Sequence, residues 1–274
     1  MNLVWGLLIT VAATAIAVTA MLFVRRSAPE GSYFADGDRA AGVFGVLATG
    51  FSVLLGFIIF LAFTSYDQSR VGAETEALTV VQQIETAQLF PEATAVELTG
   101  EIICYARSVV DDEWDRMRSG TLGDSVNPWG VEMFRSIQTL EPETASEQSA
   151  YDKWLEQTSA REQARLDRVH GAVGVIPTTL WLVLFFSALL VLGFVLFFAD
   201  SGERAVVQAL LIGAVAATVT ALMLLLYALD HPFHDGVGGL QPVAMERTLN
   251  IIDEELAVIG VVDVDGCDPM GNER

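Results

Sequence analysis

The residues with the clearest potential for metal chemistry lie between Asp230 and Asp235. His231 and His234 stand between these aspartates, and imidazole and carboxylate groups are common ligands of transition metals. Pro232 makes this stretch a turn, however, and no cysteine or third histidine lies nearby. Calcium takes several oxygen ligands from flexible loops. The main interpretation is therefore a turn that binds no metal. The alternative is a metal site, for which calcium, held by the two aspartates and carbonyls of the Gly-rich turn, is favoured over a transition metal.

Other patterns that could support catalysis are incomplete. The acidic cluster Asp111, Asp112, Glu113 and Asp115 has the spacing of a solvated helix face. The glycines at 236, 238 and 239 match neither GxxxxGK[ST] nor GxGxxG, so they form no phosphate-binding signature. Catalysis needs a nucleophile with a base, a metal cage or suitably placed carboxylates. The sequence therefore predicts that the protein is not an enzyme.

An apolar stripe on the second hydrophobic segment is more informative. Steps of three or four residues place the following side chains on one helix face: Val53, Phe57, Phe60 or Leu61, and Thr64. Such a stripe can simply pack against lipid or a neighbouring helix. Repeated around the axis of a symmetric ring, it would instead form a hydrophobic constriction, which can gate ions by dewetting.

Charged residues follow this stripe directly. Asp67 and Arg70 stand three apart and can pair on a helix surface. Glu74 and Glu76 come next on the same expected helix. If such helices line a vestibule, their carboxylates would enrich cations locally, whereas Arg70 would oppose that enrichment.

Four stretches without charge must position these residues. Residues 2–24, 40–66, 169–199 and 205–229 contain no Asp, Glu, Lys or Arg, although the chain has 35 acidic and 15 basic residues. Each stretch exceeds the roughly 20 apolar residues with which a helix crosses a bilayer. This distribution excludes an ordinary globular enzyme. We expect an all-α integral membrane protein with four transmembrane helices and a large helical insertion between the second and third helices.

The expected parts follow from these stretches. They are residues 1–66 with transmembrane helices 1 and 2, 67–170 as a soluble, vestibule-like helical region, 171–229 with helices 3 and 4, and 230–274 as a loop, a helix and a tail. No turn residue except Gly72 interrupts residues 64–90, so the second membrane helix should continue as one rod until Pro91. Thr144 or Ser146 can cap a later helix, whose end at residues 161–168 has the mixed charge of a solvated face.

Charge and cysteine content bear on partners and compartment. The net charge of −20 argues against nucleic acid, whose phosphates attract basic residues. Two cysteines, Cys104 and Cys267, are too few for a disulfide framework. The sequence leaves open whether they form one disulfide with each other, and the pair also fits a reduced compartment. Six Lys and Arg residues flank the membrane segments on the side of the central region, against four on the other. This excess favours a multi-pass protein of the cell membrane whose central region and termini are cytoplasmic.

Two motifs resemble the bestrophin family of ion channels. The first is Phe57-Ile-Ile-Phe60, followed by Tyr66-Asp67, and the second is Pro232-Phe-His-Asp235, followed by Arg247-Thr248. The chain is more similar still to the bacterial bestrophin-like group, the DUF4239 family. The stretches that carry this similarity are Ser65-Tyr-Asp67, Cys104-Tyr-Ala-Arg107, Asn127-Pro-Trp-Gly130 and His234-Asp-Gly-Val-Gly-Gly239.

The resemblance implies a homo-oligomer, a pentamer, that conducts inorganic ions across the lipid bilayer, with a cytosolic vestibule and a pore lined by the second helix. It implies that Phe57 and Phe60 narrow the pore. Together with the apolar stripe and the charges that follow it, this gives an expected pore neck at Val53, Phe57, Phe60, Leu61 and Thr64, and an expected pore exit at Asp67, Arg70 and Glu74. The chain departs from the bestrophin pattern where Gln68 and Ser69 replace Arg and Trp, and where His231 replaces Asn. The consecutive acids of the calcium clasp in animal members are also missing, so neither calcium gating nor ion selectivity carries over.

A second hypothesis comes from another functional class. The protein would be a membrane-anchored interaction or sensor protein whose acidic helical region binds a cytosolic partner. This hypothesis needs no oligomeric ring and predicts no ion flux.

Overall fold

The chain is described here by a computed structural model that covers all residues except 1–2, 31–32, 123–124, 260–266, 269 and 273–274. Each regular element in the described part is a helix, as expected for an all-α membrane protein. The chain divides into two compact units. We call residues 1–65, 174–230 and 235–239 the membrane unit, and residues 66–173, 231–234 and 240–274 the second unit.

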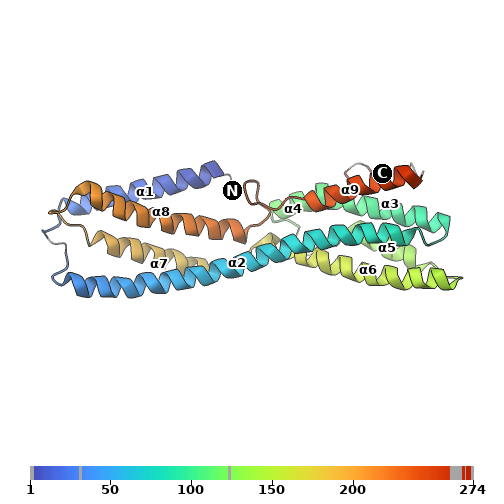
Figure 1. Cartoon of the computed structure of the whole chain (residues 1–274), viewed down its shortest axis with the longest axis horizontal. Helices are drawn as coiled ribbons and strands as arrows, with labels where there is room; N and C mark the ends of the chain where they lie inside the picture. Colours follow the sequence, from blue (N-terminus) through green and yellow to red (C-terminus); the bar gives the residue numbers. More distant parts are fainter. Residues whose placement is uncertain (1–2, 31–32, 123–124, 260–266, 269, 273–274) are drawn as a thin grey trace. The chain divides into compact units, whose positions relative to one another are not determined.

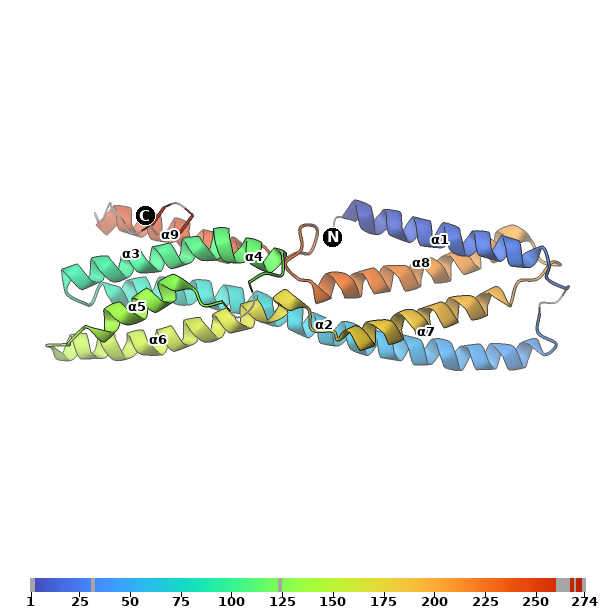
Figure 2. The same ribbon diagram turned by 180° about the vertical axis from the view of Figure 1, so that it is seen from behind.

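Four helices are long and apolar enough to cross a membrane. They are α1 (Leu3–Arg25), α2 (Gly37–Ala87), α7 (Thr178–Leu196) and α8 (Ala205–Asp230). In the membrane unit, α1 lies along α8, and α7 lies beside the first part of α2 (Figures 1 and 2). Most of their apolar surface faces outward, which suits helices surrounded by hydrocarbon.

The core of the membrane unit is built on one face of α2. Phe51, Leu55, Ile58 and Ala62 are spaced by three or four residues and are buried in a cluster with α7 and α8. The partners in this cluster include Leu184, Ala188 and Val191 of α7, and Met223 and Leu226 of α8. The spacing of the α2 residues therefore defines a buried face and leaves the opposite face uncovered by the chain itself.

The prediction of one long rod is confirmed. α2 is a single helix of 51 residues that ends at Ala87, shortly before Pro91. It contains no proline, so no backbone N–H is missing along its length. One helix thus contributes its first part to the membrane unit and its last part to the second unit.

The second unit packs several helices against the last part of α2 (Figure 1). They are α3 (Glu92–Ser108), a π-helical turn (Val109–Glu113), α4 (Trp114–Arg118), α5 (Pro128–Gln138), α6 (Ala145–His170), a 3-10 turn (Gly171–Val173) and α9 (Val243–Ile259). Their core contains Ile84, Leu98, Ile102, Trp154 and Ile252, all 2% exposed or less. The π-helical turn directly joins α3 to α4.

Helices α5 and α6 start with side-chain caps. Thr144 accepts a hydrogen bond from the Glu147 N–H at 3.2 Å, which confirms one of the two caps predicted for α6. Asn127 accepts one from the Trp129 N–H at 3.0 Å and thereby starts α5 at Pro128, the favoured place for a proline.

The structure resolves the open question of the two cysteines. Cys104 on α3 and Cys267 form a disulfide with Cα atoms 5.8 Å apart. The alternative in which both cysteines are reduced is therefore wrong for the structure described here. Because 163 residues separate the two positions, their pairing depends on how α3 packs and could not be derived from the local sequence.

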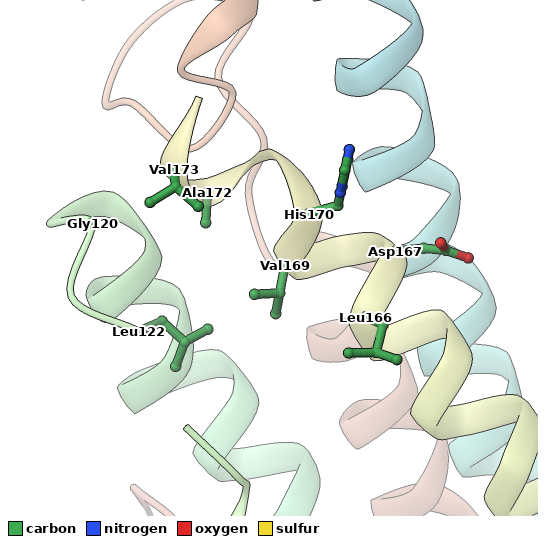
Figure 3. Close-up of a pocket in the computed structure, with 8 residues that line it drawn as sticks. All are labelled: Gly120, Leu122, Leu166, Asp167, Val169, His170, Ala172 and Val173. Carbon is green, nitrogen blue, oxygen red and sulfur yellow. The ribbon is translucent and has the colours of Figure 1, made fainter. Parts of the chain in front are cut away.

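A pocket of about 370 Å³ lies in the second unit between α6 and the turn after α4 (Figure 3). Leu122, Leu166 and Val169 contribute apolar side chains to its wall. Asp167 and His170 point away from these groups, toward α2 (Figure 3). Asp167 accepts a hydrogen bond from Gln68 of α2 at 2.8 Å. The pocket is therefore mainly a gap between packed helices rather than a polar binding site.

Candidate functional site

The five residues predicted to form a pore neck lie on exposed faces of α2 in the membrane unit. Val53, Phe57 and Phe60 are 68%, 60% and 63% exposed, and Leu61 and Thr64 are also exposed. Thr64 donates its hydroxyl to the Phe60 carbonyl at 2.9 Å, so its polar atom is satisfied within the helix. The result is a large apolar surface on the side of α2 that α7 and α8 do not cover.

The spacing of this stripe alternates regularly between four and three residues. Within the membrane unit it comprises Val46, Gly50, Val53, Phe57, Phe60 and Thr64, all of them exposed. The same spacing continues in the second unit at Asp67, Val71, Glu74 and Leu78. An average step of 3.5 residues is the period with which helices pack against one another in a supercoil. We call the membrane-unit residues of this set the α2 stripe.

The predicted pore-exit residues form one exposed ion-pair group. Arg70 donates to Asp67 at 2.8 Å and to Glu74 at 2.9 Å. The hydrogen bond that Arg70 donates to Asp67 and the charge of Glu74 raise the pKa of Arg70. The guanidinium is thus shared between two carboxylates, which leaves the group with one net negative charge. Exposed pairs of this kind add little stability, so their effect is mainly on the local electrostatic potential.

Glu76 does not join this group, which corrects the sequence-based interpretation. Its side chain is fully buried on another face of α2 in the second unit. There it forms an ion pair with Arg168 of α6 through both carboxylate oxygens. The Tyr105 hydroxyl donates to the same carboxylate at 2.5 Å. Glu76 therefore holds α2, α3 and α6 together instead of enriching cations in a vestibule.

Arg168 also binds a second buried carboxylate, Glu113. The two atoms Arg168 Nη2 and Glu113 Oε2 are 2.5 Å apart, and Arg165 Nη2 lies 2.7 Å from Glu113 Oε1. We call Glu76, Glu113, Arg165 and Arg168 the buried ion cluster. Its two acids and two arginines balance in charge, as low-dielectric surroundings require.

Two predictions about solvated charges were wrong at this cluster. Glu113 was expected on a solvated acidic face, but it is 2% exposed because the π-helical turn brings it inward. The other members of that face do lie at the surface: Asp111, Asp112 and Asp115. The end of α6 was also expected to be solvated. Instead, the arginines at 161, 165 and 168 are all buried.

The pKa values of the cluster reflect this pairing. Burial by itself would raise the pKa of Glu113, but the charges of Arg168 and Arg165 outweigh burial and lower it. Burial likewise opposes the charged form of Arg168, yet Glu76 and Glu113 raise its pKa. Glu113, Arg165 and Arg168 are therefore ionised at neutral pH, because each favours the charged form of its partner in the core.

Arg161 and Asn127 extend the polar network. Arg161 donates to Gln83 of α2 at 3.0 Å, and its guanidinium carbon lies 4.7 Å from the centre of the Tyr105 ring. Asn127 donates to Ser108 at 2.9 Å and to Glu113 at 3.0 Å. The Asn-Pro-Trp-Gly stretch noted in the sequence thus has a visible role, because its first residue both caps α5 and binds the cluster.

Asp230, one of the two candidate calcium residues, has a structural role in the membrane unit. Asp230 accepts hydrogen bonds from the backbone N–H groups of Val175 and Ile176 at 2.8 and 3.0 Å, and from Trp181 Nε1 at 3.3 Å. It thereby satisfies donors next to the start of α7. Among the described residues, no group of three or more His, Cys, Asp or Glu side chains could hold a metal. Calcium at Asp230 and Asp235 stays a prediction.

Glu101 supplies a pH-dependent contribution to stability. Burial raises its pKa to about 7; Ser136 partly opposes this shift with a hydrogen bond, and Glu97 and Glu132 add to it. A carboxyl group whose pKa is raised in the folded state stabilises the fold below its unfolded pKa of about 4.3. The contribution of Glu101 is therefore lost as pH rises through 7. We expect Glu101→Gln to raise stability at pH 8 by about 1 kcal/mol, after allowance for solvent screening, and to change little at pH 5.

Thermal unfolding of the purified protein in detergent, followed by tryptophan fluorescence at both pH values, checks this expectation. Glu156→Gln, which removes an exposed carboxylate, serves as the control and should shift the two midpoints equally. Equal shifts for Glu101→Gln as well would show that the Glu101 carboxyl does not titrate near neutral pH.

Comparisons with known proteins agree with this architecture. Residues 3–244 match the family model described as the bestrophin-like domain. A crystal structure of a bacterial bestrophin homologue from Klebsiella pneumoniae has a TM-score of 0.66 at 14% identity, covering 96% of this chain and 100% of that one. A point variant of the Klebsiella homologue has a TM-score of 0.66 at 13% identity, covering 94% of this chain and 99% of that one. A search of curated proteins by sequence finds no match.

The two kinds of comparison carry different weight. At such low identity, the likeness to the solved structures shows the fold alone. The family model covers most of the 274 residues, including the α2 stripe, the buried ion cluster and the loop after α8. The chain belongs to the bestrophin-like family.

Proposed function

We propose that the protein is a homo-oligomeric ion channel, a pentamer, in which the second helices surround the pore axis. The observation that carries this proposal is the α2 stripe, an apolar face with a 3.5-residue period that its own chain leaves uncovered. A symmetric ring of copies would place identical stripes around one axis. The family membership supports the same function.

The neck would be formed by Val53, Phe57, Phe60, Leu61 and Thr64. Bulky apolar side chains at a narrow point oppose the entry of water and therefore of ions. The exit would be formed by Asp67, Arg70 and Glu74, whose ion pairs leave one net negative charge per copy. We further propose that the second unit and both termini face the cytoplasm, as the excess of basic residues beside the central region favours, and that the chain belongs to the DUF4239 branch.

Ion flux into liposomes tests the neck. We expect Phe57→Ala and Phe60→Ala to raise flux about tenfold, because lowering the barrier by about 1.4 kcal/mol has that effect. Phe63→Ala is the matched control, since Phe63 is also an exposed phenylalanine of α2 but lies off the stripe. It should leave flux unchanged. Equal flux in all three variants and the wild type would remove the neck assignment.

The mass of the protein in mild detergent tests the ring. A pentamer with measurable flux supports the channel. A monomer or dimer without flux would contradict it and favour the membrane-anchored interaction or sensor protein.

A further inference from the structure

A short stretch near Cys267 is seated on α3 and α5. We call residues 267–268 and 270–272 the Cys267 segment. Its disulfide partner Cys104 and Cys267 itself are both fully buried. Trp129 of α5 donates its ring N–H to the Gly271 carbonyl at 2.6 Å. The segment is thus attached to the second unit by one covalent bond and by a buried hydrogen bond a few residues away.

The seat of this segment is formed by direct backbone packing. Gly271 has a φ of 78°, which favours glycine. A Cβ atom at this position would collide with the backbone N of Ser108 and would lie 2.8 Å from the carbonyl oxygen of Cys104. Asp268 stabilises the same turn by accepting hydrogen bonds from the N–H groups of Met270 and Asn272. The segment therefore fits α3 in one close arrangement.

This seat adjoins the buried ion cluster. Ser108, which the segment contacts, accepts a hydrogen bond from Asn127 at 2.9 Å. Asn127 also donates to Glu113 at 3.0 Å, and Trp129, which holds Gly271, is two residues away. A continuous set of contacts therefore connects the Cys267 segment with Glu113 and, through Arg168, with α2.

The surroundings of the disulfide favour exchange chemistry. The Arg107 guanidinium lies 3.8 Å from Cys267 Sγ. A neighbouring positive charge stabilises a thiolate, which makes Cys267 the better leaving group when a thiolate attacks Cys104. Because both sulfur atoms are buried, such an attack first requires that the segment opens locally.

We infer that the Cys104–Cys267 disulfide is a reversible redox latch, which clamps the Cys267 segment on α3 when oxidised and releases it when reduced. The reductant is a dithiol. Its first thiolate bonds to Cys104 Sγ and expels Cys267 as a thiolate; its second thiol then displaces Cys104. The reductant becomes a disulfide, and the cysteine pair gains two electrons and two protons. The reverse exchange, in which a small-molecule or protein disulfide is the oxidant and leaves as a dithiol, re-forms the bond. The proposed cytoplasmic orientation would supply such dithiols, and persistent disulfides are rare there.

Hydrogen exchange of the purified full-length protein tests the latch without any measurement of ion flux. The oxidised protein should yield a Cys104–Cys267 cross-linked peptide, and dithiothreitol should convert it into two alkylated thiols. On reduction, we expect exchange to rise about tenfold or more at residues 104–113 and 270–272. Exchange in α8 should not change. The double variant Cys104→Ser, Cys267→Ser should behave like the reduced protein under both conditions.

A second variant tests the seat with the disulfide intact. Gly271→Ala should lift the segment and make the disulfide about tenfold faster to reduce, because the buried sulfur atoms open more often. Gly120→Ala is the matched control: Gly120 has a φ of 66°, but a Cβ there meets nothing within 4 Å. It should leave the rate of reduction unchanged.

Two results would overturn the latch. One is a disulfide that a dithiol buffer poised at the potential of the cytosol cannot reduce in the folded protein. The other is full reduction that leaves hydrogen exchange at residues 104–113 and 270–272 unaltered, since the segment would then hold its place without the covalent bond. Neither result depends on whether the protein conducts ions.

Discussion

Arg168→Met is expected to destabilise the second unit by about 3–5 kcal/mol, the usual cost of removing one partner from a buried ion pair. The substitution leaves Glu76 and Glu113 in the core with Arg165 as the remaining member of the cluster. A typical domain is stable by only 5–15 kcal/mol. The variant should therefore unfold at a clearly lower temperature, or fail to accumulate.

The pH dependence gives this prediction a second readout. Because the folded pKa of Glu113 is lowered, its contribution to stability is present above the unfolded pKa of about 4.3 and is lost as pH falls through the folded value. Without Arg168, the same carboxylate is better buried when protonated. The deficit of Arg168→Met relative to wild type should therefore shrink as pH falls toward 4.

Tryptophan fluorescence during unfolding is a direct measurement, since the Arg168 guanidinium carbon lies 5.6 Å from the centre of the Trp114 ring. Arg135→Met is the control, because Arg135 pairs with Glu132 on the surface, and its loss should cost at most about 1 kcal/mol. Replacing Glu76 and Glu113 with glutamine in the Arg168→Met background should recover part of the stability. If Arg168→Met lowers the free energy of unfolding no more than Arg135→Met does, the buried ion cluster does not hold the second unit together.

Gly72→Ala is expected to disrupt the contact between α2 and α6. A Cβ atom at this position would lie 2.5 Å from the backbone N of Arg168 and 2.8 Å from the carbonyl oxygen of Ala164. These are backbone atoms, so no side chain can move aside, and the two helices must separate. Overpacking of this kind costs about 1–3 kcal/mol, and here separation also lengthens the contacts of Arg168 with Glu76.

Gly56→Ala provides a control on the same helix with the opposite expected sign. A Cβ at Gly56 meets nothing within 4 Å, and alanine favours a helix by about 1 kcal/mol over glycine. Denaturant unfolding of both variants should show destabilisation for Gly72→Ala and no loss for Gly56→Ala. If both variants gain stability, α2 and α6 do not approach as closely as described.

Local sequence patterns were sufficient for the helical architecture. The length of each charge-free stretch predicted the four membrane helices, because crossing a bilayer requires a minimum apolar length wherever the helix lies in the fold. The uninterrupted stretch after Thr64 predicted that α2 continues beyond the membrane segment. The spacing of Val53, Phe57 and Phe60 predicted a common face, since helix geometry alone places such residues together.

The same patterns could not show which polar residues are buried. Glu76 and Glu74 are both acidic residues of α2, yet Glu76 is fully buried because Arg168 meets it there, 92 residues later in the chain. Glu113 is buried because a π-helical turn shifts the register of its helix. Gly72 reads as a permissive residue in the sequence, whereas α6 packs so closely that a side chain would not fit.

Sequence by itself therefore determined the class of protein, its four membrane helices and the apolar stripe of α2, because apolar length and helical period are properties of a single segment. Tertiary structure alone decided the buried ion cluster, the close approach at Gly72 and the Cys104–Cys267 disulfide. Each of these depends on residues far apart in the chain that meet only when the helices pack. In the core, a charge requires a partner of opposite charge, and a close contact between helices requires glycine; on the surface neither would be required.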